Sequence, residues 1–333
     1  MVSAELYEQI SKENIELIAE FLEYLRSTDK SPQTISQYEN DAKIFFVWNL
    51  KFNTNKFFVD LTKRDIMKYQ NYMLNELKLS SNRIRRLKAT ISSMSNFIES
   101  MMDDLHPHFR NIINKIAAPS KQTVREKTIL SEDQVDFLLN HLVENKQYQQ
   151  ACAFALAVAS GARKSELPRF KVSYFVDENI KYGALYKTSE LIRTKGRGSR
   201  GKMLYKYVLV SKFKPYFDMW MKEREELGIV GEDLFWCKSG NLWKPAEGYR
   251  LDAWARGFSK ILGVDFYWHS LRHYFTTELA KNNIPADVIK DIVGWENLEM
   301  VSLYTDSEID DELGKYFDAS GIKSVEKKNI SDV

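Results

Sequence analysis

One stretch near the end of the chain constrains the fold more than any other. Residues 268–306 read WHSLRHYFTTELAKNNIPADVIKDIVGWENLEMVSLYTD. Apolar residues recur at helical spacing from Leu271 to Leu279, so this part is predicted to be an amphipathic helix. A second helix is predicted to open at Pro285, where a missing N–H costs nothing, and to close at Gly294.

Charged and imidazole side chains gather near the start of the first of these helices, at His269, Arg272 and His273. A cation at a helix N-terminus favours an anionic ligand, because the free N–H groups point the same way. The two histidines, four residues apart, also allow a metal site. The zinc-protease pattern needs Glu directly after the first His, whereas this chain has Ser270, and no metal is expected.

Six residues of this chain, in their order and spacing, resemble the C-terminal signature of the tyrosine recombinase (phage integrase) family: His269, Arg272, His273, Gly294, Trp295 and Tyr304. Tyr304 lies nine residues past Trp295, which is the family's usual interval. The resemblance implies that Tyr304 attacks a DNA phosphate. It also places His269, Arg272 and Trp295 in the active site. Trp295 stands where His is commoner, and it offers only an indole N–H donor.

An apolar, Ala-rich helix is predicted over residues 149–160, buried on all sides, and it runs into GARKSEL at 161–167. An Arg that leaves a buried helix is costly unless it meets an anion. Arg163 could pair internally with Glu166, three residues further on. The family resemblance instead places both residues in the active site, Arg163 as the first catalytic arginine and Glu166 as an acid.

A glycine-rich basic stretch follows. Residues 184–186 and 207–210 read as strands on either side of it, so a hairpin is predicted. The resemblance puts the catalytic lysine on such a hairpin; Lys195 is the candidate and Lys202 the alternative. The other basic residues of this hairpin are predicted to hold the DNA backbone: Arg193, Arg197, Arg200 and Lys202.

The first hundred residues predict a small helical domain, with helices over residues 14–26, 32–48, 63–77 and 81–101. Ser31, Thr62 and Ser80 are the predicted caps, and Asp65 would complete an approximate capping box with Thr62. Four basic residues crowd the first two turns of the last helix. They form either a solvated basic face or a DNA-binding face: Arg83, Arg85, Arg86 and Lys88. This succession of helices resembles the core-binding domain of the family.

The predicted fold is mainly α with a small β-sheet or hairpin, in two domains. A helical core-binding domain covers residues 1–116, a linker covers 117–127, and an α+β catalytic domain covers 128–333. The linker lacks apolar periodicity, and Ser131 then caps a new helix. A tail helix is predicted after Tyr304. Its apolar face would dock on a neighbouring protomer or on its own domain: Ile309, Leu313, Tyr316 and Phe317.

Charge distribution points to a nucleic-acid partner although the net charge is only +2. Residues 191–214 hold eight basic residues and no acidic one, as expected of a phosphate-binding face. The longest apolar run, 151–159, is far short of the ~20 residues of a membrane span. Two cysteines make no disulfide framework. A cytoplasmic, nucleoid-associated protein is expected.

The resemblance implies site-specific DNA recombination by transesterification. Tyr304 would form a 3′-phosphotyrosyl link and release a 5′-hydroxyl, without a metal ion or other cofactor. The expected partner is a duplex recombination site, bound by a homotetramer that assembles on DNA through the C-terminal helix. Two alternatives are a type IB topoisomerase, which relaxes DNA without synapsis, and a DNA-binding regulator without activity.

Overall fold

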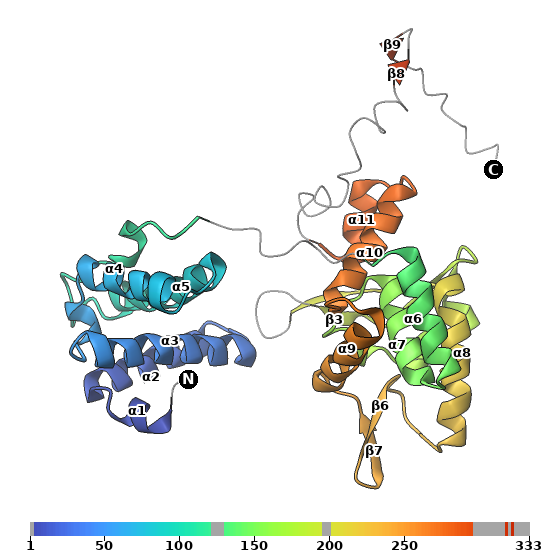
Figure 1. The fold of residues 1–333 in the computed structure, drawn as a ribbon, viewed down its shortest axis with the longest axis horizontal. Helices are drawn as coiled ribbons and strands as arrows, with labels where there is room; N and C mark the ends of the chain where they lie inside the picture. Colours follow the sequence, from blue (N-terminus) through green and yellow to red (C-terminus); the bar gives the residue numbers. More distant parts are fainter. Residues whose placement is uncertain (1–2, 121–129, 195–200, 296–316, 319–320, 323–333) are drawn as a thin grey trace. The chain divides into compact units, whose positions relative to one another are not determined.

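The computed structural model describes residues 3–120, 130–194, 201–295, 317–318 and 321–322 (Figure 1). The chain divides into two compact units, unit 1, which includes residues 1–126, and unit 2, which comprises residues 127–195 and 202–333. The predicted domain bounds stay a prediction, because residues 121–129 lie outside the described ranges.

Unit 1 is helical (Figure 1). Its helices are α1 (Ala4–Glu8), α2 (Lys12–Ser27), α3 (Pro32–Phe52), η1 (Phe58–Asp60), α4 (Lys63–Asn71), the π-helical η2 (Tyr72–Glu76), α5 (Ser81–Met101) and η3 (Ile113–Lys115). Ser31 and Ser80 accept hydrogen bonds from backbone N–H groups in the first turns of α3 and α5. Thr62 and Asp65 form a reciprocal capping box at α4. The four predicted helices and their caps are therefore confirmed.

The apolar faces of α2, α3, α4 and α5 meet in one core. Phe21, Phe45, Ile66 and Ile91 are each 0% exposed there. The ring of Phe45 meets Tyr69 edge-on, with 5.0 Å between ring centroids. The helical spacing of apolar residues thus predicted both the helices and the faces that pack together.

Unit 2 is built from helices and short strands (Figure 1). Its helices are α6 (Glu132–Glu144), α7 (Tyr148–Ser160), η4 (Leu167–Arg169), η5 (Val172–Tyr174), η6 (Asp177–Asn179), α8 (Val210–Glu226), α9 (Gly248–Leu262), α10 (Trp268–Lys281) and α11 (Ala286–Val293). Ser131 caps α6, as predicted. Pro285 is the N-cap of α11 rather than its first residue, and Gly294 ends that helix in the left-handed conformation.

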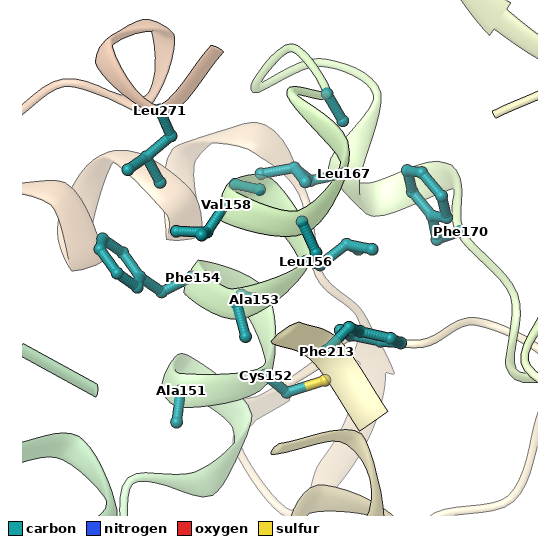
Figure 2. Packing of buried hydrophobic residues seen from close by; sticks show 14 of the residues in the cluster. Ala151, Cys152, Ala153, Phe154, Leu156, Val158, Leu167, Phe170, Phe213 and Leu271 are labelled. Carbon is teal, nitrogen blue, oxygen red and sulfur yellow. The ribbon is translucent and has the colours of Figure 1, made fainter. Parts of the chain in front are cut away.

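Helix α7 lies in the middle of the core of unit 2. All ten residues from 151 to 160 are buried, which confirms the prediction of a helix buried on all sides. Figure 2 shows Phe154, Leu156 and Val158 among side chains from several other elements, including Phe213 and Leu271. The phenyl ring of Phe154 meets that of Phe258 edge-on at 5.6 Å. The end of α7 is therefore a fixed point for the residues that follow it.

The strands form small antiparallel sheets. β1 (Ile180–Lys181), β2 (Leu185–Lys187) and β5 (Tyr207–Leu209) make one sheet, in which Tyr186 pairs with Val208. β3 (Ile192–Thr194) pairs with β4 (Lys202–Leu204), and β6 (Trp236–Ser239) pairs with β7 (Leu242–Pro245). The two predicted strands do pair, and the basic stretch between them forms a second ladder, β3–β4. The mainly helical fold with small sheets is thus confirmed.

The predicted tail helix is testable only at its last apolar residue. Phe317 lies in strand β8 (Phe317–Asp318), which pairs with β9 (Gly321–Ile322), so the helical prediction is wrong at that residue. Ile309, Leu313 and Tyr316 lie outside the described residues. In the part of the chain that the structure describes, no helix is long and apolar enough to span a membrane.

Candidate active site

Arg163 leaves the buried end of α7 and meets Glu166. Its Nη1 donates to Glu166 Oε1 at 2.9 Å, and its backbone N–H donates to Oε2 at 3.1 Å. The Glu166 side chain is 0% exposed, whereas that of Arg163 is 20% exposed. The internal pair is therefore present. It uses one of the five N–H donors of the guanidinium, so the pair is compatible with phosphate binding by Arg163.

Arg272 is completely buried in α10, and two helix ends surround its charge. Its Nη1 donates to the carbonyl of Gly161 at 3.0 Å, and its Nη2 donates to the carbonyl of Val293 at 2.8 Å. Gly161 caps α7 and Val293 is the last residue of α11, so both carbonyls are at negative helix ends. These contacts bring Arg272 to the same helix end that Arg163 follows.

Both helix ends need glycine. Gly161 has φ +58° and Gly294 has φ +79°, in the left-handed region that other residues rarely adopt. A Cβ on Gly161 would lie 2.6 Å from the ring of Phe275. A Cβ on Gly294 would lie 2.6 Å from Leu204. The two glycines therefore allow the close packing that delivers the two carbonyls to Arg272.

Trp295 follows the second of these glycines and packs on Arg272. The guanidinium carbon lies 5.3 Å from the centre of the indole ring, within cation–π range. Trp295 is 6% exposed and shares a small apolar cluster with Phe275, Ile289 and Val293. The sequence predicted Trp295 as a hydrogen-bond donor. The structure adds a second role, since the ring covers the charge of a buried arginine.

The two histidines of α10 contact each other. The rings of His269 and His273 are 4.7 Å apart and nearly perpendicular, with His269 exposed and His273 buried. Among the described residues, no group of three or more His, Cys, Asp or Glu side chains gathers that could hold a metal ion. His269 is thus the member of the pair that can reach a ligand.

Sequence reasoning missed one charged residue of this site, Lys206. Its Nζ lies 2.7 Å from Glu166 Oε2, and its side chain is 1% exposed. A signal was present in the sequence: Lys206 and Val208 are two residues apart, so a strand places both on the same, inward face. The lysine was hidden among the other basic residues of the stretch.

Several predicted site residues lie outside the described residues, namely Lys195, Arg197, Arg200 and Tyr304. Arg193 and Lys202 lie on the paired strands on either side of residues 195–200. Arg193 is exposed on β3, and its carbonyl accepts a hydrogen bond from Arg169. Lys202 is half-buried on β4 opposite Thr194, which donates to its carbonyl at 2.9 Å. The ladder thus presents basic residues on both strands.

The basic start of α5 in unit 1 is largely engaged within its own unit. Arg83 and Arg86 lie 2.8 and 3.2 Å from the carboxylate oxygens of Asp41, which is itself buried. Lys88 is 5% exposed. Its Nζ donates to Gln70 Oε1 at 2.6 Å and to the carbonyl of Ile116 at 2.8 Å. This position argues against a phosphate contact by Lys88.

Arg85 is exposed and takes no part in the two ion pairs with Asp41. Its Nη1 donates to the carbonyl of Pro119 at 2.8 Å, which ties the start of the predicted linker to α5. A second bond, from Gln70 Nε2 to the carbonyl of Ala117 at 3.0 Å, does the same. Of the four predicted basic residues, Arg85 and the half-exposed Arg86 keep the most surface for a ligand.

Comparison with known families matches residues 128–310 to the phage integrase family and residues 17–106 to the phage integrase N-terminal SAM-like domain. The SPbeta prophage-derived recombinase-like protein YomM of Bacillus subtilis is 30% identical over 270 residues, which are 79% of this chain and 77% of that protein. Tyrosine recombinase XerD of Oceanobacillus iheyensis is 25% identical over 301 residues, covering 86% of this chain and 92% of that protein.

Solved structures share the fold. A lambda integrase dimer bound to a COC′ core site matches with a TM-score of 0.64 and 17% identity, over 94% of this chain and 80% of that chain. The XerH site-specific recombinase bound to its difH substrate, in a pre-cleavage complex, matches with a TM-score of 0.63 and 15% identity, over 89% of this chain and 94% of that chain.

Proposed function

Because this chain belongs to the phage integrase family, we propose that it is a site-specific DNA recombinase that exchanges strands through a tyrosine nucleophile. The family predicted from the sequence motifs is thereby confirmed. The observation that carries the proposed function is the setting of Arg272. A buried guanidinium is fixed by the ends of two helices, and Arg163 follows one of these ends by two residues.

In the proposed cleavage step, the phenol oxygen of Tyr304 attacks the scissile phosphorus, and the bond from phosphorus to the 5′ oxygen breaks. The phenol proton passes to His269, and the leaving 5′ oxygen takes a proton from Lys195, with Lys202 the alternative donor. Negative charge gathers on the non-bridging oxygens. Arg163 and Arg272 stabilise it as planar donors that are already in place. Attack of another 5′-hydroxyl on the phosphotyrosine reverses the step and joins new strands.

Two further residues act through the arginines. Glu166 fixes both the backbone and the side chain of Arg163. Trp295 covers Arg272 on one side. Positioning and electrostatics of this kind can supply most of the catalysis of phosphoryl transfer.

For DNA binding we propose phosphate contacts by Arg193, Arg197, Arg200 and Lys202 around the β3–β4 ladder, and by the exposed basic residues at the start of α5. The core-binding unit, residues 1–116, and the catalytic unit, residues 128–333, would hold the duplex while residues 117–127 link them. We propose a tetramer on paired sites, joined through the C-terminal segment, that acts on DNA of the nucleoid in the cytoplasm. The dimeric lambda integrase on a core site supports assembly on DNA by analogy.

The test starts from random-sequence duplex DNA, because it does not require a known target. The purified full chain is incubated with the library, and DNA that stays attached to protein in SDS is recovered and sequenced. We expect enriched duplexes with a shared core, attached by their 3′ phosphate to Tyr304. Tyr304→Phe should retain these duplexes on native gels and form no SDS-resistant adduct.

An adduct of undiminished yield with Tyr304→Phe would refute the nucleophile. Wild-type protein that forms adducts and relaxes supercoils, yet exchanges no strands between two selected duplexes, would favour a topoisomerase. Sequence-specific binding without any adduct would favour a regulator.

A further inference from the structure

Lys206 is a lysine on the inward side of a strand-like segment. Tyr205 is 41% exposed, whereas Lys206 is 1% and Val208 0% exposed, so the side chains alternate between the surface and the interior. The backbone of Lys206 is held on both sides by Thr188. The Lys206 N–H donates to Thr188 Oγ1 at 3.0 Å, and the Thr188 N–H donates to the Lys206 carbonyl at 3.0 Å. The ammonium is therefore delivered into the interior from a fixed backbone.

The interior position is tolerable only because of Glu166. Burying an ammonium costs several kcal/mol after relaxation, unless a partner compensates it. The Lys206 Nζ lies 2.7 Å from Glu166 Oε2, with both side chains at 1% exposure or less. Burial lowers the pKa of Lys206, and the nearby positive charges of Arg272 and Arg163 lower it further. The carboxylate of Glu166 acts in the opposite direction and raises it. Lys206 and Arg163 thus both contact the Glu166 carboxylate, and the charge of Arg272 acts on Lys206.

Glu166 uses both oxygens. Oε1 accepts from the guanidinium of Arg163, while Oε2 accepts from the backbone N–H of Arg163 and from Lys206. Burial acts to raise the pKa of Glu166, but Lys206 and then Arg163 outweigh it and hold that pKa below its ordinary value. Lys206 and the backbone N–H of Arg163 therefore share the carboxylate oxygen that the Arg163 guanidinium does not contact, and Lys206 makes the shorter contact, 2.7 against 3.1 Å.

We infer that Lys206 is a positioning residue of the recombinase site, which holds Glu166 and, through it, sets Arg163 to receive the scissile phosphate. This inference rests on the proposed function. Without Lys206, the backbone N–H of Arg163 would be the only remaining partner of Oε2 among the described residues. The carboxylate could then turn and take a second N–H of the Arg163 guanidinium, which would withdraw a donor from the phosphate. Lys206 also leaves the cluster with an excess of positive charge, which suits a phosphate that gains negative charge during attack.

Stability alone does not explain this lysine. A buried ion pair replaced by apolar residues of similar volume is often as stable as the original or more so. A positioning role predicts something different, namely that the neutral replacement folds but reacts slowly.

The experiment measures single-turnover adduct formation on a duplex selected as described above, with protein in excess. Lys206→Met should slow the step by about 100-fold, the scale expected when a reacting group is misplaced by about 1 Å. Its affinity for the duplex should stay within about 2-fold, since a side chain that is 1% exposed is not expected to contact DNA. Lys206→Arg, which keeps the charge, should recover a large part of the rate. Lys187→Met is the matched control, because Lys187 lies on the neighbouring strand β2 with its ammonium 4.4 Å from the Tyr205 ring centre.

Two readouts separate positioning from mere structural support. The first is a double-mutant cycle: Lys206→Met combined with Glu166→Gln should be no slower than Glu166→Gln alone, since both changes break one chain of contacts. The double variant has no unpaired buried charge at positions 166 and 206. It can therefore be measured even if Lys206→Met alone does not fold. The second is the pH profile of the cleavage rate. Its acidic limb should move to higher pH in Lys206→Met, because Glu166 loses a cation that holds its pKa down.

Other charges face this pair, and they stay in place in the variants. Arg163 contacts Glu166, Arg169 of η4 interacts with Glu166 electrostatically, and Arg272 of α10 interacts with Lys206. A Lys206→Met rate within about 2-fold of wild type, an additive loss in the double variant, or an unmoved acidic limb would each overturn the inference. Failure of the wild type and of Lys187→Met to form any adduct would instead refute the proposed function.

Discussion

The two arginines of the site are held in different ways. Arg272 is held by neutral groups, among them the carbonyls that end α7 and α11 and the ring of Trp295. Arg163 is held by the carboxylate of Glu166, which is itself held by Lys206. Arg272 is 0% exposed, whereas a fifth of the Arg163 side chain, 20%, reaches the surface.

This difference separates two tasks. Helix dipoles do not titrate, so the two carbonyl contacts tie the position of Arg272 to the packing of α7, α10 and α11. The position of Arg163 depends on charges that can change with pH and with single substitutions. Arg272 is thus positioned by the packing of the fold, whereas the position of Arg163 depends on an ion-pair network.

Arg272→Ala should have the largest effect, because it removes a transition-state donor and a structural element together. Cleavage should fall by about 10²–10³-fold or more, the scale for losing one such donor. The two buried carbonyls of Gly161 and Val293 lose their partner, which should cost about 2 kcal/mol or more of stability. Urea denaturation and single-turnover cleavage measure the two losses. Near-normal cleavage would contradict the role of Arg272, and unchanged stability would contradict its structural part.

Arg163→Ala should slow cleavage on the same scale, about 10²–10³-fold. Its stability loss should be smaller, about 1–2 kcal/mol, because Glu166 keeps Lys206 as a charged partner. Denaturation of Arg163→Ala and Arg272→Ala under one condition tests the comparison directly. If Arg163→Ala proves the less stable of the two, the division between fold and site is wrong.

Glu166→Gln should reveal how much of the protein's stability depends on pH through the carboxylate that holds Arg163. The pKa of Glu166 is below its ordinary value, chiefly because Lys206 and Arg163 outweigh the effect of burial. An ionised carboxyl of this kind adds stability above its unfolded pKa of about 4.3, and that stability is lost as pH falls through the lower folded pKa. At neutral pH the variant should lose about 3 kcal/mol, as expected when a buried cation loses its partner.

The difference in melting temperature between wild type and Glu166→Gln should therefore shrink as pH falls below about 4. Glu223→Gln is a control of opposite sign, because burial raises the pKa of Glu223, with Glu226 adding to the shift. Removing that carboxyl should raise stability at neutral pH, and the gain should fade in acid. A Glu166→Gln deficit that stays constant from neutral pH into acid would show that the carboxylate is not the pH-sensitive part.

Gly161→Ala tests the helix end that holds Arg272. The new Cβ meets a left-handed backbone and the ring of Phe275 at 2.6 Å, so the Gly161 carbonyl should shift. We expect a stability loss of about 1–3 kcal/mol and about 10-fold slower cleavage. Gly263→Ala is the matched control, since Gly263 also ends a helix, at φ +67°, with nothing within 4 Å of the added atom. Equal cleavage rates in the two variants would show that the Gly161 carbonyl does not position Arg272.

Sequence reasoning reached the parts of the molecule that local patterns encode. The caps at Ser31, Thr62 and Ser131 depend on residues three positions away, and all three formed as predicted. The motifs at Arg163 and Arg272 named both arginines. The pairing of Arg163 with Glu166, three positions away, was also open to prediction. The setting of Arg272 was not, because the Arg272–Gly161 contact joins residues 111 positions apart.

Long-range pairing also explains what the sequence could not show at the start of α5. The basic run allowed either a solvated face or a DNA-binding face. Asp41 lies 45 positions from Arg86 and pairs with it and with Arg83. Lys88 follows the apolar side of α5 and is buried. Charge runs alone do not tell which members a distant acid neutralises.

Trp295→His should have the smallest effect. It separates the contribution of the indole ring to the position of Arg272 from that of the two helix ends. Other family members carry His at this position, so an imidazole can work there. The smaller ring loses part of the cation–π contact, worth about 0.5–2 kcal/mol, while the carbonyls of Gly161 and Val293 still hold the guanidinium. Cleavage should therefore fall by less than about 10-fold, with the fold intact by circular dichroism. Trp295→Ala should lose more, because it also opens a cavity beside Phe275 and Val293. A complete loss in the folded Trp295→His variant would mean that the indole, rather than the two helix ends, is what fixes Arg272.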